Sequence, residues 1–173
     1  MAVRHEQKAV EEGPSASEAA ALEQERRMLY CLSQVPSLGA VSIQELGEFF
    51  GGFSNLFNIE ETALRESGIL REGQIQALCG AKKNLTKHLE DYERLAERGI
   101  WFVTPLDKEY PERLRHIHGY PMGLYVRGKL PDPHLPAAAV VGARGCSEYG
   151  IQLAATFAEL LAKEQPDYKA NKK

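Results

Sequence analysis

The residue types best suited to binding chemistry gather in one stretch near the C-terminal end of the sequence. Residues 140–150 read Val-Val-Gly-Ala-Arg-Gly-Cys-Ser-Glu-Tyr-Gly, an apolar run that leads through a glycine-rich turn. A helix is predicted to follow, and the N–H groups and dipole of a helix N-terminus favour an anion. Gly142 allows close approach of the backbone to a ligand, and Arg144 offers a planar cation suited to phosphate or to a base. The stretch predicts a phosphate site, with a purely structural turn as the alternative. For Ser147 the sequence offers a helix cap or a bond to a phosphate oxygen, and for Arg144 it offers a ligand role or pairing with a nearby carboxylate.

Other chemistry finds less support in the sequence. Gly145 and Gly150 have the spacing of a P-loop, but Ile151-Gln152 stands where Lys-Ser/Thr is needed, which disfavours NTP hydrolysis of that type. The dinucleotide motif G-x-G-x-x-G is absent, so no nicotinamide or flavin cofactor is expected. His116 and His118 lack a third ligand, so we expect no metal. No acid–base pair or activated nucleophile stands out, and catalysis is not expected.

The elements that must position this stretch begin with a predicted helical module over residues 17–99. Leu22, Leu29 and Leu32 lie on one face of a helix that ends near Pro36. Ser42 and Glu45 have the spacing of a capping box for a second helix, which Gly51-Gly52 ends. Further helices are expected over residues 60–67, 71–80 and from about 85 to 99. Residues 1–16 are predicted to be a disordered tail.

The pattern changes after Gly99 from helical periodicity to short apolar runs. Residues 100–103, 124–128 and 137–141 read as strands. Trp101 is expected in the core, and Asp107 with Tyr110-Pro111 is expected to form a turn and the start of a helix. A helix is expected from about Glu148 to Ala162; it is apolar on two sides and so requires cover on both. Residues 163–173 are predicted to be a polar tail. The fold class is therefore α/β (mixed), with a domain boundary between the helical module and residues 100–162.

The bulk composition limits the kind of binding that is expected. The 173 residues include 21 Lys and Arg against 24 Asp and Glu, for a formal net charge of −3. Nucleic-acid-binding domains are usually basic, so any DNA site must be local. No apolar stretch approaches the roughly 20 residues that span a bilayer, so no membrane partner is expected. Three separated cysteines disfavour a disulfide framework and predict a cytoplasmic protein.

Three ordered blocks of sequence resemble the DNA-processing protein A (DprA/Smf) family. Their spacing is more specific than any one block, and the resemblance covers roughly residues 25–162. The helical front half is similar to the family's sterile-alpha-motif-like (SAM) or helix-hairpin-helix-like (HhH) module. The blocks are Ile100-Trp101-Phe102-Val103-Thr104 with Asp107, Tyr110-Pro111, Leu114 and Ile117; Tyr120-Pro121 with Leu124-Tyr125-Val126 and Gly128; and Val140 to Gly150.

The resemblance implies a cytosolic protein that binds and protects single-stranded DNA and loads a RecA-type recombinase during natural transformation. It implies a Rossmann-like domain whose Gly-x-Arg loop contributes to the DNA pocket. The family's site residues carry over to Gly142, Arg144, Ser147, Tyr149 and Gly150. The family's next strand and loop, with further pocket and dimerisation residues, have no match after residue 162. We therefore expect the N-terminal part of such a protein, with its homodimer and recombinase contacts incomplete.

Two other functions compete with this interpretation. One is a Rossmann-like nucleotide phosphoribohydrolase, which would need a catalytic Glu and a second glycine-rich loop. The other is a fragment that keeps only the helical module as an interaction surface. A βαβ unit buries its helix against at least two parallel strands, so residues 137–173 are predicted to be locally unstable.

Overall fold

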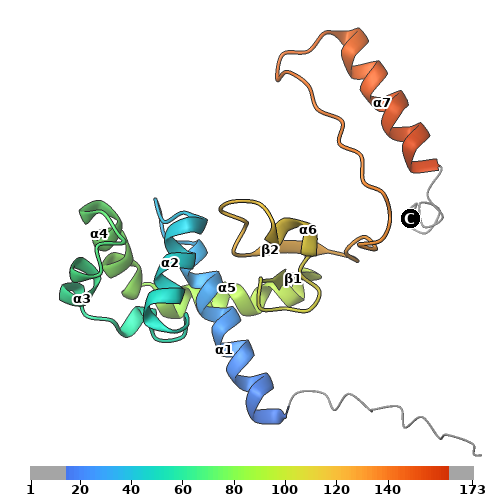
Figure 1. Ribbon diagram of the computed structural model, residues 1–173. Coiled ribbons are helices and arrows are strands. Elements are labelled where there is room, and N and C mark those ends of the chain that lie inside the picture. Colours follow the sequence, from blue (N-terminus) through green and yellow to red (C-terminus); the bar gives the residue numbers. More distant parts are fainter. Residues whose placement is uncertain (1–14, 164–173) are drawn as a thin grey trace, which may run out of the picture. The chain divides into compact units, whose positions relative to one another are not determined.

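The computed structural model describes residues 15–163 and divides into two compact units (Figure 1). The first unit ends at Pro131 and the second begins at Asp132, so the boundary predicted after residue 99 lies inside the first unit. Helices and two strands together confirm a mixed α/β class. The elements are α1 (Ala16–Ser33), α2 (Ala40–Phe50), the 3-10 turn η1 (Leu56–Asn58), α3 (Glu61–Glu66), α4 (Glu72–Lys82), α5 (Leu85–Glu97), β1 (Ile100–Val103), α6 (Glu112–Arg115), β2 (Leu124–Arg127) and α7 (Glu148–Lys163).

Helix α1 supplies the centre of the first unit's core. A capping box fixes its start: the Ser15 hydroxyl accepts from the Glu18 N–H at 3.3 Å, and the Ser15 N–H donates to the Glu18 carboxylate at 2.8 Å. Its C-terminal half is buried, including Leu29, Cys31 and Leu32 at 0% exposure. The apolar face predicted from the leucine spacing therefore becomes the contact surface for the surrounding helices and sheet.

Helix α2 begins three residues earlier than predicted. Gly39 is its N-cap, so the expected cap from Ser42 and Glu45 is wrong. The preceding turn delivers the chain into the helix early, and the Gln74 side chain donates to the Ser37 carbonyl at 3.0 Å. The helix ends as predicted, because Gly51 adopts a left-handed φ of 74° that ordinary side chains avoid.

Strands β1 and β2 pair antiparallel, with Ile100 opposite Arg127. Phe102 lies opposite Tyr125, and their rings meet edge to face at 5.2 Å. The Phe102 ring also meets Tyr30 of α1 edge to face at 5.3 Å, which joins the sheet to the helical core. The helices and the first strands thus share one core.

Two side chains around the sheet depart from the sequence interpretation. Trp101 was expected in the core, but it is 39% exposed, and its indole N–H donates to the Gly128 carbonyl at 3.2 Å. It lies opposite Val126 in a sheet that has two strands within residues 15–163. Pro111 precedes α6 rather than starting it.

The third predicted strand does not form in the described residues. Residues 137–141 carry no strand structure, and Val141 is 88% exposed. A strand needs a neighbour for its N–H and C=O groups, and β1 and β2 pair only with each other among residues 15–163. The apolar run marks a segment suited to a sheet, but the pairing partner that would make it a strand is not in this part of the chain.

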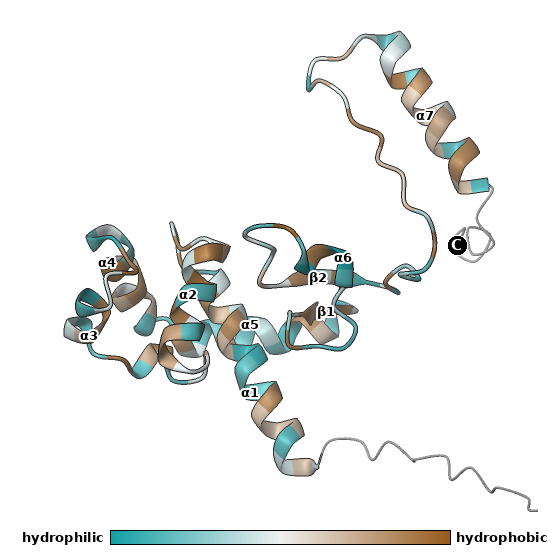
Figure 2. Cartoon of the chain, viewed as in Figure 1, coloured by the Kyte–Doolittle hydropathy of each residue, from teal (hydrophilic) through white to brown (hydrophobic). Residues whose placement is uncertain are grey.

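Helix α7 follows the predicted bounds closely, and both of its sides are apolar (Figure 2). None of its residues is buried. Large apolar side chains stand exposed along its length: Ile151, Leu153, Phe157, Leu160 and Leu161. The cover that two apolar faces require is therefore absent from the described residues of the second unit.

Replacement of Gly123 by alanine tests how tightly the sheet packs. A Cβ at Gly123 would stand 1.9 Å from Cζ of the buried Phe102 ring. We expect Gly123→Ala to lower the free energy of unfolding of the first unit by about 1–3 kcal/mol, measured by denaturant titration. Gly80→Ala in α4 is the matched control: nothing lies within 4 Å of its new methyl, so it should stabilise by about 0.5–1 kcal/mol. Equal midpoints for both variants would contradict this packing.

Amide hydrogen exchange tests the predicted instability of the second unit. Because no α7 residue is buried, we expect the amides of residues 148–163 to exchange much faster than those of Leu29 to Leu32 in α1. Protection in α7 equal to that of the α1 core, together with one cooperative unfolding transition for the whole chain, would refute the prediction.

Candidate functional site

The predicted binding turn leads directly into helix α7. Ser147 is the cap: its hydroxyl accepts from the Gly150 N–H at 3.2 Å, and its carbonyl accepts from the Ile151 N–H at 3.0 Å. This is the structural role that the sequence offered for the hydroxyl. The amides of Glu148 and Tyr149 have no hydrogen-bond partner among residues 15–163. The N-terminus of α7 therefore keeps donors available for an anion.

Arg144 and Tyr149 are the two large side chains of the site. Both are exposed, Tyr149 at 72%. The Arg144 guanidinium makes no ion pair or hydrogen bond with another residue in the range 15–163. The alternative in which a nearby carboxylate neutralises Arg144 is thus not found within that range. A planar cation and a phenol ring in the open are suited to phosphate and to base faces respectively.

The glycines of the turn are not required by its backbone conformation. Neither Gly142 nor Gly150 has a positive φ, so the tight turn predicted at Gly142 would accept other residues. A Cβ added at Gly142 or Gly145 meets nothing within 4 Å, and one at Gly150 reaches only ordinary contact with Cys146 at 3.5 Å. What Gly142 contributes is bare backbone, which matters only where another molecule comes close.

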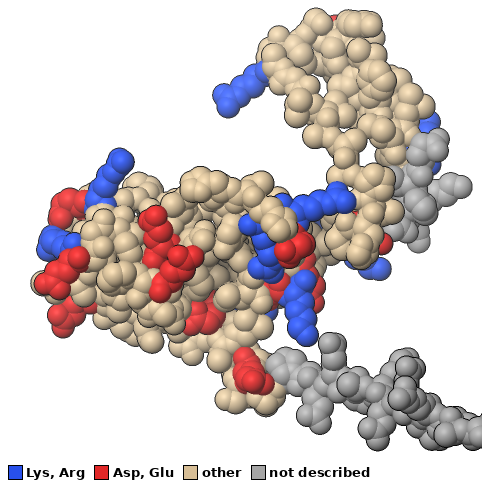
Figure 3. Space-filling view, in the orientation of Figure 1, with Lys and Arg blue, Asp and Glu red and all other residues tan. Residues whose placement is uncertain are grey.

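The electrostatic attraction of this site is small. Among residues 132–163 the basic side chains are Arg144 and Lys163, and Lys163 pairs with Glu159 at 3.0 Å. Glu148 adds a negative charge in the first turn of α7. Figure 3 shows charges of both signs over the first unit and few on the visible surface of the second. An anion would be held by one guanidinium and by backbone N–H groups rather than by a basic field.

A hollow of about 450 Å³ lies elsewhere in the second unit. The extended segment before the turn forms one wall, and the C-terminal half of α7 forms the other. Its lining is entirely apolar: Pro136, Ala137, Ala138, Val140, Ala158, Leu161 and Ala162. It holds no group that could orient a phosphate, so we assign no chemistry to it.

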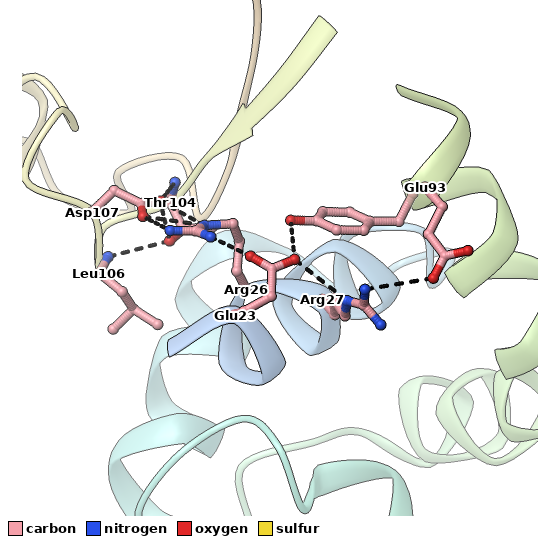
Figure 4. A network of polar contacts seen from close by, with 8 residues as sticks. Glu23, Arg26, Arg27, Glu93, Thr104, Leu106 and Asp107 are labelled. Carbon is pink, nitrogen blue, oxygen red and sulfur yellow. Dashed lines mark hydrogen bonds and ion pairs between the residues drawn. The ribbon is translucent and has the colours of Figure 1, made fainter. Parts of the chain in front are cut away.

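The main polar network of the first unit joins α1 to the turn after β1 (Figure 4). The Arg26 Nε donates to both Asp107 oxygens, at 3.1 and 3.3 Å, and a terminal nitrogen bonds the same carboxylate. The Thr104 N–H and hydroxyl donate to Asp107 Oδ2 at 2.7 and 2.8 Å. Sequence reasoning assigned Asp107 to a turn, which is correct, but missed Arg26 because 81 positions separate the two residues.

The ionisation of this network follows from burial and pairing. Burial alone would raise the pKa of Asp107, but hydrogen bonds from Arg26 and Thr104 outweigh it, and the pKa lies below its usual value. Burial, with the Glu23 carboxylate close by, raises the pKa of Tyr92 to about 12. Tyr92 therefore stays neutral and donates its hydroxyl proton to Glu23 at 3.1 Å.

Beside this network lies an open hollow of about 540 Å³, here called the Trp101 hollow, whose walls include Trp101, Tyr92, Ile100, Glu93 and Glu109. Acidic residues outnumber basic ones in its lining, and Arg26 and Arg27 are committed to ion pairs with Glu23 and their other partners. A polyanion would meet net repulsion here, so this hollow is not a phosphate site.

Metal binding and membrane insertion are the two remaining alternatives for the described residues. Across residues 15–163 no three His, Cys, Asp or Glu side chains come together in a group able to hold a metal ion. The Nε2 atom of His116 lies 3.6 Å from the Glu112 carboxylate oxygen Oε1. None of the helices in that range is both long and apolar enough to cross a membrane.

Comparisons with known proteins agree with the resemblance seen in the sequence. Residues 101–167 match the family model described as DNA recombination-mediator protein A. A Protein Smf from Synechocystis is 27% identical over 137 residues, 76% of this chain, and one from Borreliella burgdorferi is 39% identical over 78 residues, 44% of this chain. A Mycobacterium tuberculosis protein whose name includes "DNA processing protein DprA" is 33% identical over 97 residues, 49% of this chain. No solved structure matches significantly.

The matches cover only part of the relatives. They span 34% of the length of the Synechocystis protein and 25% of the Borreliella and Mycobacterium proteins. The family-model match includes all five residues of the candidate site. The similarity therefore bears on this stretch directly and on the activity of a complete relative only indirectly.

Asp107→Asn tests the polar network by its effect on pH dependence. The native pKa of Asp107 lies below the unfolded value of 3.8, so its stabilisation is present above that pH and is lost as pH falls through the native pKa. We expect the variant to unfold more easily at neutral pH, by about 3 kcal/mol, and to lose less stability on acidification.

The measurement is denaturant unfolding of the first unit at several pH values. Glu66→Gln is the matched control, because Glu66 is exposed and has no hydrogen bond or ion pair with another described residue. The network assignment fails if Asp107→Asn and Glu66→Gln show the same stability and the same pH profile.

Proposed function

The chain is related in sequence to the DNA-processing protein A (DprA/Smf) family, and on that premise we propose that it binds single-stranded DNA. The binding residues are Gly142, Arg144, Ser147, Tyr149 and Gly150. The observation that carries the proposal is a guanidinium and two N–H groups at a helix N-terminus that have no partner among residues 15–163, inside the stretch that the family model matches. We found no observation that favours a second function.

The chemistry of binding divides between phosphate and base. Arg144 and the amides of Glu148 and Tyr149 hold backbone phosphates, while Ser147 keeps those amides oriented by capping α7. The exposed Tyr149 ring offers a face on which one base can stack, which is independent of sequence because every base has such a face. Gly142 keeps the turn free of a side chain where the strand passes.

The finer features of the fold belong to the same proposal. Residues 137–141 and α7 form the first strand–turn–helix unit of a Rossmann-like domain, in which a parallel neighbour would pair the segment and cover α7. Residues 17–99 act as a SAM- or HhH-like module. The extended apolar segment and the two apolar sides of α7 support this assignment.

The proposed biological role is that of a recombination mediator rather than an enzyme. In this role the cytoplasmic protein protects incoming single strands and passes them to a RecA-type recombinase, while the expected homodimer contacts are incomplete in this part of the protein. The name of the Mycobacterium relative concerns DNA processing, and the family description concerns recombination mediation. These partners follow from similarity, and the DNA-binding turn is the part that can be tested first.

Binding of a labelled oligo-thymidine strand tests the proposal. We expect binding that unlabelled duplex of equal length displaces poorly, and that Arg144→Ala weakens roughly fivefold to tenfold. Because one cation is available, the dependence on salt should be shallow, corresponding to one or two phosphates. Arg144→Lys should bind with intermediate affinity, because it keeps the charge but loses the planar fork.

A pair of glycine variants distinguishes a binding site from a turn that has only a structural role. Gly142→Ala and Gly145→Ala both add a methyl with nothing within 4 Å, so neither should change the folding of the turn. If the strand passes against Gly142, only Gly142→Ala weakens binding. Wild-type affinity in both Arg144→Ala and Gly142→Ala, with α7 intact by circular dichroism, would reject the site.

A further inference from the structure

Trp101 is the single tryptophan of the sequence and stands at the edge of the Trp101 hollow. Its indole N–H is already bonded to the Gly128 carbonyl, so the part of the side chain left open is the apolar ring. The residue is 39% exposed, although its strand neighbours Phe102 and Val103 are buried. A large ring with its one polar atom satisfied and its surface uncovered is suited to contact with another molecule.

The wall of the Trp101 hollow is largely apolar. Besides Trp101, side chains from α5 and β1 form it: Tyr92, Leu95, Ile100, Phe102 and Val103. Tyr92 and Phe102 are fixed by edge-to-face contacts with Tyr30 at 5.3 Å each. These two parts of the wall are therefore held by the core of the first unit.

Two carboxylates give the opening of the hollow its charge. Glu93 is 60% exposed along its side chain and makes only a long contact, 3.5 Å, with Arg27. Glu109 is exposed and has no ion pair or hydrogen bond with another residue of the described range. The inner carboxylates differ, because Asp107 is satisfied by Arg26 and Thr104. The charge left over at the opening is negative.

We propose that the Trp101 hollow is a docking site for a partner protein that inserts an arginine side chain. The guanidinium would stack on the Trp101 ring and pair with Glu109 and Glu93, which is the combination of cation–π and charge-assisted contacts that arginine provides. Lysine fits less well, because a compact ammonium ion cannot stack on the ring as a plane. A nucleic acid is excluded by the acidic opening. The site lies in the first unit and does not depend on DNA binding by residues 142–150.

Tryptophan emission gives a direct reading of this site in the full chain. The probe is the peptide acetyl-(Arg-Gly)4-amide, with acetyl-(Lys-Gly)4-amide and acetyl-(Glu-Gly)4-amide as comparisons. We expect the arginine peptide to change Trp101 emission in a saturable way, the lysine peptide to bind several times more weakly, and the glutamate peptide to have no effect. Oligo-thymidine should also leave the emission unchanged.

Charge-matched variants separate docking from general attraction to an acidic protein. Glu109→Gln should weaken the arginine peptide roughly fivefold, whereas Glu66→Gln in α3 removes the same charge away from the hollow and should change nothing. Thermal unfolding checks that both variants are folded. No emission change with the arginine peptide, an equal response to both variants, or emission quenching by oligo-thymidine instead would overturn the proposal. Loss of DNA binding in Arg144→Ala has no bearing on this result.

Discussion

The ion pair between Arg26 and Asp107 joins two parts of the first unit that are 81 positions apart in the sequence. It links α1 to the turn after β1, and Thr104 on the same turn holds the carboxylate from the other side. Asp107 is 5% exposed, so removing Arg26 would leave a carboxylate charge in a place that water hardly reaches. The sheet, its aromatic contact with Tyr30 and the Trp101 hollow are all arranged around this connection. Arg26 and Asp107 also line the Trp101 hollow, so this ion pair helps to shape the proposed docking site without contacting the docked arginine.

The parts of the fold that the sequence predicted are those with local causes. Leucine spacing indicated α1, Gly51 marked the end of α2, and short apolar runs bounded by glycine and proline indicated β1 and β2. The failures have distant causes. Ser42 looked like a cap, but a turn held by Gln74 started the helix three residues earlier. Trp101 looked like core, but it is 39% exposed on a sheet that has two strands in the described part of the chain. Arg26 and Asp107 meet only because the chain folds back across 81 positions.

The sequence indicated which residues belong to the candidate DNA site, but it did not decide which of them have a structural role and which stay available for binding. Pattern alone indicated a turn followed by a helix, and the structure adds that Ser147 caps α7 while Arg144 stays unpaired within residues 15–163. The extended apolar segment before the turn shows that an apolar pattern alone does not determine whether a strand forms. A run such as Ala137 to Val141 records a preference for burial in a sheet, and that preference produces a strand only when another backbone supplies the hydrogen bonds. The proposed function and the missing strand therefore concern the same neighbourhood of the chain.

The close approach of Phe102 to Gly123 makes these two positions a single shared volume. The ring occupies the space that any side chain at 123 would need, with only 1.9 Å between Cζ and the place of a Cβ. Among homologous sequences, a larger residue at one position should therefore accompany a smaller residue at the other, so that the pair covaries. Because the same ring contacts Tyr30 and Tyr125, such an exchange would shift the sheet relative to α1. Substitutions at these two positions would therefore first change how the rings of Tyr30, Phe102 and Tyr125 pack, and only then affect charged contacts.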